Sequence, residues 1–179
     1  MVAIVLGNGF EEMEAIVPCD MLRRAGIETV LAGIGGREIT GSRGIRVTAD
    51  TTVEALNPDA IDMIVLPGGL GGVKAIEGSC QTMTLVQRLW QEGKFVAAIC
   101  AAPTLLAKLG ITDQKQATCY PGMEEQMGEA LMQPAGCAVQ DGRVITATAA
   151  GTAYRFALQL ITALKGEAAA EAVARAIVL

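Results

Sequence analysis

The chain contains 179 residues, a length typical of one domain that buries enough apolar surface to fold without disulfides or a metal ion. Its 14 Lys and Arg residues and 19 Asp and Glu residues give a formal net charge of -5, and it has one Trp, two Tyr and three Phe. An acidic chain with so few aromatic side chains is not expected to bind nucleic acid. The chain has no histidine, which excludes Ser-His-Asp catalysis, Cys-His catalysis and histidine-ligated metal sites within it.

The sequence predicts a cytoplasmic protein with reduced thiols and no membrane segment. The first ten residues, MVAIVLGNGF, lack the basic residues of a signal peptide, and no apolar run reaches the ~20 residues of a membrane helix. The number of cysteines is odd and no pair has the CxxC spacing, which argues against a disulfide framework or a zinc ribbon. The five cysteines are Cys19, Cys80, Cys100, Cys119 and Cys137.

Short apolar or β-branched runs alternate along the chain with amphipathic stretches. This alternation predicts the α/β class, with a mostly parallel sheet between two layers of helices, in a single domain over residues 1–179. In chain order, we expect a strand Val2–Leu6, a helix from about Glu11 to Ala25 kinked at Pro18, a strand Thr29–Ile34, short extended pieces over Glu38–Ala49, a brief helix over Asp50–Leu56, a strand Met63–Leu66, a glycine-rich loop Pro67–Gly72, a helix from about Thr82 to Glu92, a strand Phe95–Ile99, a helix Pro103–Leu109, a hairpin Ala138–Ala147, and helices Ala153–Leu164 and Glu167–Ala176.

Cys100 is the strongest candidate for a reactive residue. It directly follows the apolar strand 95–99, and the small residues of Ala98-Ile99-Cys100-Ala101-Ala102 suit the tight turn of a nucleophile elbow. Such a turn would place the sulfur at the carboxyl end of a central strand, where open α/β sheets bind ligands. The N-terminus of the next helix would then lower the pKa of the thiol. The alternative is a buried core cysteine without a chemical role.

The first helix begins with the acidic run Glu11-Glu12-Met13-Glu14. Solvated carboxylates that complement the helix dipole would explain Glu11 and Glu12. Glu14 precedes the apolar residues 15–17 and belongs to a helix that must pack on the sheet, so it can point inward. Burial there would raise the pKa of its carboxyl group and allow acid–base chemistry.

Backbone amides and arginines near these residues can bind negative charge. The N–H groups of Gly68 and Gly69, after the strand 63–66, can form an oxyanion hole with the amide that follows Cys100. This loop lacks the Walker A lysine and the GxGxxG spacing, so a nucleotide phosphate site is not supported. Arg43 and the pair Arg23-Arg24 are candidate cations for an anionic substrate, with solvated surface charge as the alternative.

Four segments carry a family resemblance: Gly9-Phe10-Glu11-Glu12-Met13-Glu14, Arg23-Arg24-Ala25-Gly26, Leu66-Pro67-Gly68-Gly69, and Ala97-Ala98-Ile99-Cys100-Ala101-Ala102-Pro103. Together they resemble the ThiJ/PfpI superfamily, and its DJ-1-like branch in particular, nearly from end to end. The resemblance implies a flavodoxin-like three-layer sandwich, a homodimer, and a peroxide-sensitive Cys100 that is hydrogen-bonded to a protonated Glu14. It also implies that the amides of Gly69 and Ala101 line the pocket, and that Arg24 and Arg43 lie near it at the dimer interface.

Two segments depart from the family pattern. Many relatives have a pocket histidine where the segment 118–121 places Tyr120, and the segment 147–150 replaces a polar turn. A protease of the Cys-His type, which occurs in another branch, is therefore excluded. Tyr120 can either donate a proton in place of the histidine or form an aromatic wall of the pocket.

These residues lead to two main hypotheses of function. The first is a glyoxalase or deglycase that needs no cofactor or metal and acts on methylglyoxal-like 2-oxoaldehydes or their adducts. Cys100 would be its nucleophile, Glu14 its acid–base group, and Gly69 and Ala101 its oxyanion donors. The alternative is a redox-responsive stress or chaperone-like protein whose Cys100 oxidises to sulfinate without turnover. A third possibility is a vestigial thiol in a dimer that only binds partners.

Overall fold

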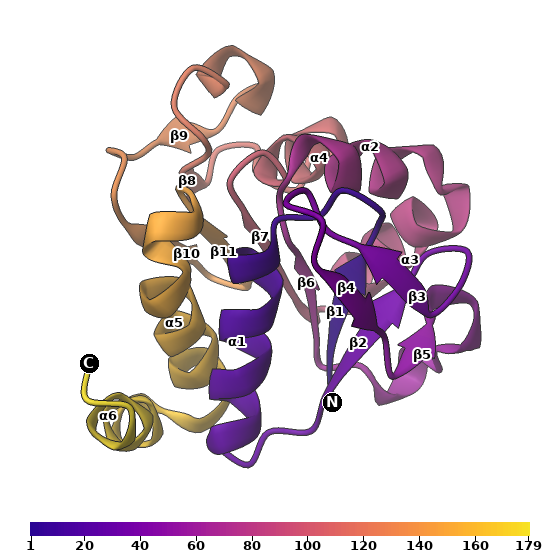
Figure 1. Ribbon diagram of the computed structural model, residues 1–179. Helices are drawn as coiled ribbons and strands as arrows, with labels where there is room; N and C mark the ends of the chain where they lie inside the picture. The colour runs from indigo at the N-terminus through magenta and orange to yellow at the C-terminus, as the bar shows by residue number, and fades with distance from the viewer.

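The structure is a computed structural model that describes residues 1–179, and a seven-stranded sheet forms its central layer (Figure 1). The strands of this sheet are β1 (Val2–Leu6), β2 (Thr29–Gly33), β5 (Thr51–Thr52), β6 (Met63–Leu66), β7 (Phe95–Ile99), β10 (Ala138–Asp141) and β11 (Val144–Ala147). Their order is β10-β11-β7-β6-β1-β2-β5, and only β10 pairs antiparallel with its neighbour. The five longest parallel strands run β2-β1-β6-β7-β11, which is the 2-1-3-4-5 order of flavodoxin-like folds. The predicted fold class is therefore confirmed.

Six helices cover the two faces of the sheet. They are α1 (Glu12–Arg24), α2 (Leu70–Gly78), α3 (Cys80–Gln91), α4 (Pro103–Lys108), α5 (Ala153–Lys165) and α6 (Glu167–Ala176). One face packs against α1 and α5, with α6 beyond α5, and the other face packs against α2, α3 and α4 (Figure 1). None of these helices combines the length and the apolar character that a membrane span requires.

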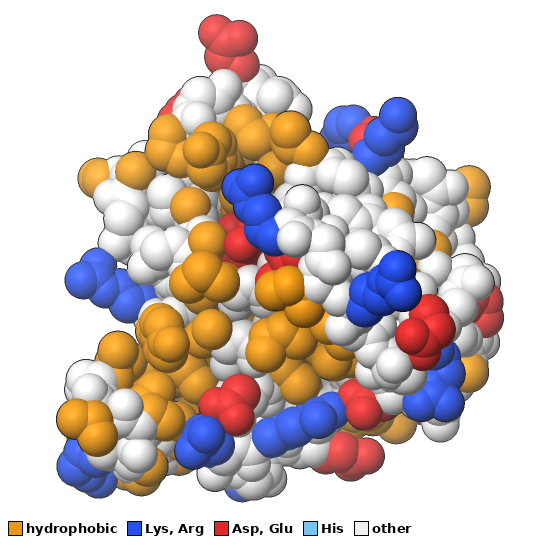
Figure 2. Space-filling model, viewed as in Figure 1, with side chains coloured by type: hydrophobic (Ala, Val, Ile, Leu, Met, Phe, Trp, Pro, Cys, Tyr) orange, Lys and Arg blue, Asp and Glu red, His pale blue; other side chains and the backbone are white.

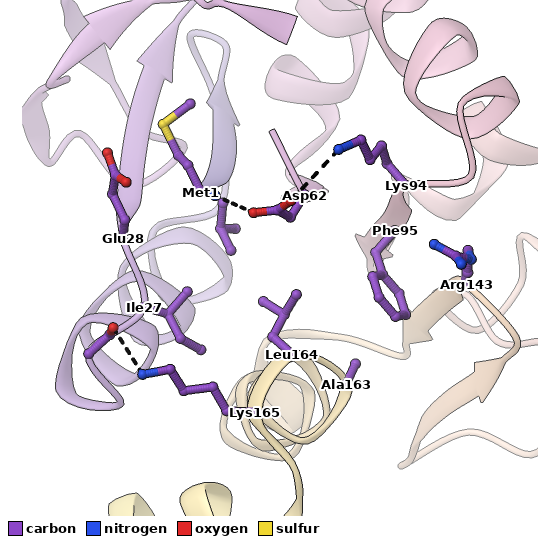
Figure 3. Close-up of a pocket in the computed structure, with 12 residues that line it drawn as sticks. Met1, Ile27, Glu28, Asp62, Lys94, Phe95, Arg143, Ala163, Leu164 and Lys165 are labelled. Atoms are coloured by element: carbon purple, nitrogen blue, oxygen red, sulfur yellow. Dashed lines mark hydrogen bonds and ion pairs between the residues drawn. The ribbon is translucent and has the colours of Figure 1, made fainter. Parts of the chain in front are cut away.

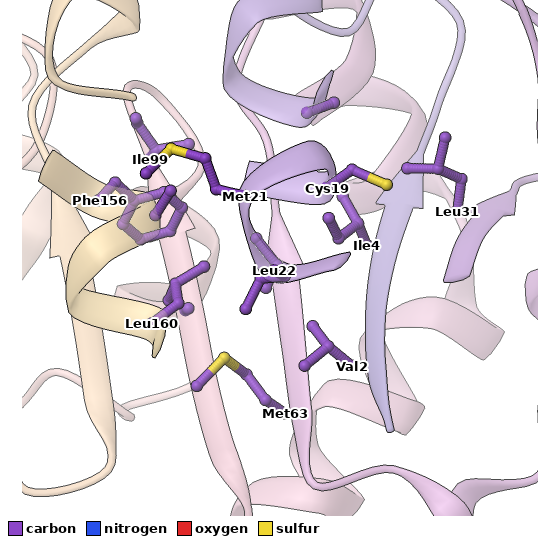
Figure 4. Close-up of a cluster of buried hydrophobic side chains, with 14 of the residues drawn as sticks. Val2, Ile4, Cys19, Met21, Leu22, Leu31, Met63, Ile99, Phe156 and Leu160 are labelled. Carbon is purple, nitrogen blue, oxygen red and sulfur yellow. The ribbon is translucent and has the colours of Figure 1, made fainter. Parts of the chain in front are cut away.

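The apolar composition of the central strands follows from this double covering. Every residue of β1 and β6 is buried, as parallel strands with helices on both sides require. On the α1 and α5 face, Met21 and Leu22 of α1 and Phe156 of α5 pack above Ile99 and Met63 of the sheet (Figure 4). This packing sets the position of α1, whose first turn carries the acidic run.

Smaller elements complete the chain. A hairpin pairs β3 (Glu38–Thr40) with β4 (Arg46–Thr48), and a second small sheet pairs β8 (Gln116–Ala117) with β9 (Leu131–Met132). Short 3-10 turns lie at 53–55, 58–60, 124–127 and 150–152. The helix expected over Asp50–Leu56 is wrong, because its first part is the edge strand β5, which pairs with β2, and only one 3-10 turn follows.

Helix α2 is the main element that the sequence prediction missed. The segment Pro67–Gly72 was expected to be a loop, but the helix already begins at Leu70. Its glycines allow the turn after β1 to pack directly on it: a Cβ atom at Gly72 would lie 2.7 Å from the Cα atom of Phe10. These glycines therefore serve close packing between two backbones, at the point where the chain leaves β1 for α1.

Two substitutions in α2 test this packing. Gly72→Ala should lower the free energy of unfolding by about 1–3 kcal/mol because of the overlap with Phe10, although alanine favours helices. Gly78→Ala is the matched control, since a Cβ atom there meets nothing within 4 Å, and should leave stability unchanged or slightly raised. Urea unfolding of both variants measures the difference. Equal effects at the two positions would contradict the packing role.

Candidate active site

The predicted site residues meet in a cavity of about 700 Å³ at the carboxyl ends of the central strands. Its lining residues are Gly9, Glu11, Glu14, Ser42, Arg43, Gly69, Leu70, Gly71, Cys100, Ala101, Tyr120, Met123, Ala149, Ala150 and Gly151. Six of the predicted site residues therefore line one cavity within the chain: Glu14, Arg43, Gly69, Cys100, Ala101 and Tyr120. Arg23, which pairs with Asp50 at 2.5 Å, does not line it, and neither does Arg24. Arg24 lies in the last turn of α1 and pairs at 2.6 Å with Asp20, one helical turn earlier.

Cys100 occupies a strained turn between β7 and α4. Its φ angle is +68°, a left-handed conformation that non-glycine residues rarely adopt. Two hydrogen bonds hold this backbone: the N–H of Cys100 donates to the Ala147 carbonyl at 2.9 Å, and the N–H of Tyr120 donates to the Cys100 carbonyl at 2.8 Å. The buried residue Ala101 follows directly. This geometry is that of the nucleophile elbow expected from the sequence.

Glu14 lies fully buried beside Cys100. Its Oε2 atom accepts a hydrogen bond from the Gly68 N–H at 2.8 Å, whereas its Oε1 atom has no hydrogen-bond partner. The expectation that the Gly68 N–H contributes to an oxyanion hole is therefore wrong, because Glu14 already accepts from it. A Cβ atom at Gly68 would lie 2.5 Å from Oε2 of Glu14 and 2.6 Å from the Cβ atom of Cys100. Only glycine at this position leaves room for the carboxyl group and the cysteine to lie together.

Burial changes the proton affinity of both groups. Desolvation raises the pKa of Glu14 from 4.5 to about 7, as expected from the sequence, although a hydrogen bond from Gly68 acts in the opposite direction. Desolvation and the neighbouring Glu14 carboxylate also raise the pKa of Cys100 to about 12. The direction for Cys100 is opposite to the one expected from the helix N-terminus, because burial and the carboxylate outweigh the amides. The two groups titrate as a coupled pair. Removal of the second proton would place two negative charges side by side, so it requires a much higher pH than removal of the first.

Backbone amides surround this pair. The nearby amides of Gly69 and Ala101 oppose the rise in the pKa of Cys100 by favouring its charged form, and the amide of Ala150 acts in the same way on Glu14. The contribution of Ala150 was not predicted. Its position after β11, the strand next to β7, is the signal that could have revealed it, because the ends of adjacent parallel strands lie close together.

Glu12 has a different environment from the solvated one that the sequence predicted. Only 6% of its surface is exposed, and its carboxylate accepts hydrogen bonds from the turn 41–45. Although burial opposes ionisation, the hydrogen bonds from Arg43, Ser42 and Ile45 contribute to a pKa for Glu12 below its usual range. Glu11 instead caps α1, since its Oε2 atom accepts from the Glu14 N–H at 2.9 Å.

A second cavity, of about 530 Å³, lies at the amino ends of the central strands, opposite the first cavity (Figure 3). Its cationic side chains already have partners in the chain: Lys165 donates to the carbonyls of Ala25 and Gly26, and Lys94 lies 3.7 Å from Asp62. It contains no cysteine. No three histidine, cysteine, aspartate or glutamate side chains cluster anywhere in a way that could hold a metal ion. The cavity around Cys100 is therefore the candidate active site.

Known proteins similar to this chain fall in one family. The model of the DJ-1/PfpI family matches residues 1–163. The chain is 39% identical over 178 residues to protein dj-1beta of Drosophila melanogaster, covering 98% of this chain and 95% of that protein. It is 30% identical over 165 residues to a Pyrococcus abyssi protein named a deglycase, covering 92% and 99% of the two chains.

Solved structures give the same result. The crystal structure of Drosophila melanogaster DJ-1beta has a TM-score of 0.94 and 39% identity, covering 99% of this chain and 97% of that one. Oxidized DJ-1 of Toxoplasma gondii has a TM-score of 0.93 and 30% identity, with coverage of 99% and 97%. The chain has the flavodoxin-like fold of these proteins and, by sequence and structure together, belongs to the DJ-1/PfpI family.

Proposed function

We propose that this protein is a glyoxalase or deglycase that needs no cofactor and acts on 2-oxoaldehydes such as methylglyoxal or on their adducts. The observation that carries the proposal is the burial of Glu14 beside Cys100 at the base of a cavity. A carboxyl group whose pKa lies near neutrality can both accept and donate a proton at physiological pH. The Pyrococcus abyssi relative is named a deglycase, which supports the deglycase form of this proposal.

In the first step, the thiol proton of Cys100 moves to the Glu14 carboxylate while the sulfur attacks the aldehyde carbon, C1, of the substrate. A C–S bond forms and the carbonyl π bond breaks, which leaves a negative charge on oxygen. The amides of Gly69 and Ala101 can stabilise this oxyanion. Glu14 then gives its proton to the oxygen, and the product is a hemithioacetal beside an ionised carboxylate.

In the second step, Glu14 removes the proton from C1 and returns it to C2 of the same molecule. The hydroxyl proton of the hemithioacetal ends on the C2 oxygen, so that C1 becomes a thioester carbonyl and C2 carries a hydroxyl group. C1 is oxidised and C2 is reduced within one molecule, without an external oxidant. Water then cleaves the thioester and releases a 2-hydroxy acid and the Cys100 thiol.

A redox response is the second candidate function. Cys100 is only half-buried and faces the cavity, so a peroxide can reach its sulfur. Oxygen transfer from peroxide to the thiolate would give a sulfenate and then a sulfinate, with release of water. The solved structure of an oxidized relative from Toxoplasma gondii favours this alternative.

We also propose a homodimer through the outer face of α1. Met13 and Ile16 of α1 are 46% and 39% exposed, and Tyr154 at the start of α5 is 41% exposed. Hydrophobic side chains gather on this side of the molecule, over α1 and α5 (Figure 2). An apolar face of this kind is typical of a surface that associates with a second copy.

Turnover of methylglyoxal tests the enzyme proposal. Cys100→Ser should lose at least about 99% of the activity, because it removes the nucleophile, and Glu14→Gln should lose a similar share, because an amide cannot accept the C1 proton. The rate of the unsubstituted protein should rise through pH 7, where the pair loses its first proton. Native turnover by Cys100→Ser would refute the proposal. An inactive protein in which peroxide oxidises Cys100 before the other thiols would support the redox function instead.

The pH dependence of stability tests the state of Glu14. Because folding raises the pKa of Glu14 from 4.5 to about 7, the folded state favours the neutral carboxyl group. Its contribution to stability is complete below pH 4.5 and is lost as the pH rises through 7, a loss of roughly 3 kcal/mol for an isolated group. Glu14→Gln cannot ionise, so its unfolding free energy should lack this decline. Parallel pH profiles of the two proteins in urea unfolding would show that Glu14 is not buried as a neutral group.

Sedimentation tests the dimer. The protein should sediment with twice the 18.5 kDa mass of the chain at micromolar concentration, and Ile16→Glu should shift it to the monomer, because the substitution places a charge in an apolar contact. Leu131→Glu, at an exposed apolar residue of β9, is the control and should remain dimeric. A monomer in the unsubstituted protein, or a dimer that survives Ile16→Glu, would contradict the proposed interface.

A further inference from the structure

Arg43 is the only cationic side chain that lines the Cys100 cavity. Its guanidinium group makes no hydrogen bond and no ion pair with another residue of the same chain, so within one protomer its donors are available to a ligand in the cavity. The other charged residues of the lining are Glu11 and Glu14, and Glu11 is held by the N–H of Glu14. An exposed arginine beside a nucleophile supplies a positive charge at the point where a substrate enters.

The turn that carries Arg43 folds around the carboxylate of Glu12. Oε1 of Glu12 accepts the N–H of Arg43 at 2.7 Å and that of Ile45 at 3.4 Å, while Oε2 accepts the Ser42 hydroxyl at 3.1 Å. A Cβ atom at Gly41 would lie 2.4 Å from this carboxylate. The inside of the turn is therefore filled by a side chain from α1 and has no space for another one.

Few other contacts tie this turn to the rest of the protein. The Ser42 N–H donates to the Phe10 carbonyl at 2.7 Å, and the Gly41 N–H donates to Ile45 within the turn itself. Glu12 thus supplies most of the acceptors that hold residues 42–45 against α1. The same helix carries Glu14, so one element positions both the acid–base group and the arginine of the cavity.

We propose that, among 2-oxoaldehydes and their adducts, the cavity favours those that carry an anionic group, such as a carboxylate or a phosphate, over neutral ones such as methylglyoxal. Glu12 is the positioning residue that holds Arg43 in place to bind this group. This inference rests on the proposed role of Cys100 as the nucleophile. It goes further in assigning the charge of the substrate and a structural origin for the selectivity.

The sign of the effect separates positioning from simple electrostatics. Removal of the negative charge of Glu12 would, by itself, make the cavity more attractive to an anion. If Glu12 acts by holding Arg43, substitution of Glu12 instead makes the cavity less attractive to an anion, because the released turn moves Arg43 away from the cavity. A loss of anion preference after deletion of an acidic residue is therefore diagnostic.

Alkylation of Cys100 by two reagents of similar size measures this preference. Iodoacetate is an anion and iodoacetamide is neutral, and in both cases the thiolate forms an S–C bond while iodide leaves. The rate constants at Cys100 are determined by mass spectrometry of its peptide in the full chain, so that the exposed Cys80 does not interfere. The ratio of the two rate constants reports the local charge and does not depend on turnover of any substrate.

Arg43→Met should lower the ratio of iodoacetate to iodoacetamide about three- to fivefold, as expected for loss of one partly exposed cation. Glu12→Ala should lower the ratio to the same value. The double variant should show no further decrease, because both substitutions remove the same interaction of Arg43 with the anion. Glu12→Gln keeps a carbonyl acceptor for the Arg43 N–H and should recover most of the ratio. Glu38→Ala, at an exposed acid of β3, is the control and should not lower the ratio.

A ratio that is unchanged or raised in Glu12→Ala would overturn the positioning role, and an unchanged ratio in Arg43→Met would overturn the selectivity. Lack of any alkylation at Cys100 in the unsubstituted protein would overturn both. If the ratios change as expected but the protein turns over no aldehyde, the proposed function is refuted and the present inference is not. If the ratio is the same in all variants but the protein turns over methylglyoxal, only the present inference is refuted.

Discussion

The close approach of Glu14 to Cys100 is the constraint on which the rest of the site depends. It requires three conditions at once: a turn at Cys100 with a φ angle of +68°, a residue without a side chain at Gly68, and a helix α1 that directs a carboxyl group inward. A left-handed turn and a buried unpaired oxygen both cost free energy. The packed core between α1, α5 and the sheet provides the stability that tolerates this cost.

The same constraint accounts for the electrostatics of the cavity. Two acidic groups buried side by side cannot both ionise easily, so they hold at least one proton between them near neutral pH. That proton can move from sulfur to oxygen when the sulfur attacks, while the amides of Gly69 and Ala101 stabilise negative charge nearby. A site without histidine can in this way perform nucleophilic and acid–base chemistry with one thiol and one carboxyl group.

Much of this arrangement could be predicted from the sequence because its signals are local. The apolar runs of β1 and β7, the small residues around Cys100 and the inward position of Glu14 in an amphipathic helix all lie within short segments. The features that were missed depend on contacts between distant segments. Gly72 favours a loop by its own propensity, but it lies in α2, where its lack of a side chain lets Phe10, a residue distant in the sequence, pack against the helix.

The environment of Glu12 shows the same limitation. Nothing in the first turn of α1 indicates that residues 42–45 supply hydrogen-bond donors to Glu12, so the sequence alone predicts a solvated carboxylate. The pKa of Cys100 was expected to fall because the sequence reveals a following helix but not the depth of burial. Arg24 lies in the last turn of α1 and pairs with Asp20 in the same chain, and its place near the pocket of a dimer stays a prediction.

The rate of Cys100 alkylation by iodoacetamide as a function of pH tests most directly whether Cys100 and Glu14 share a proton. In the unsubstituted protein, the rate should rise through pH 7, where the pair loses its first proton and the carboxylate becomes able to take the thiol proton. In Glu14→Gln this step should disappear, and the rate should rise only as the thiol itself ionises at higher pH. Identical pH profiles in the two proteins would show that Glu14 and Cys100 titrate independently, and the proposed chemistry would then be wrong.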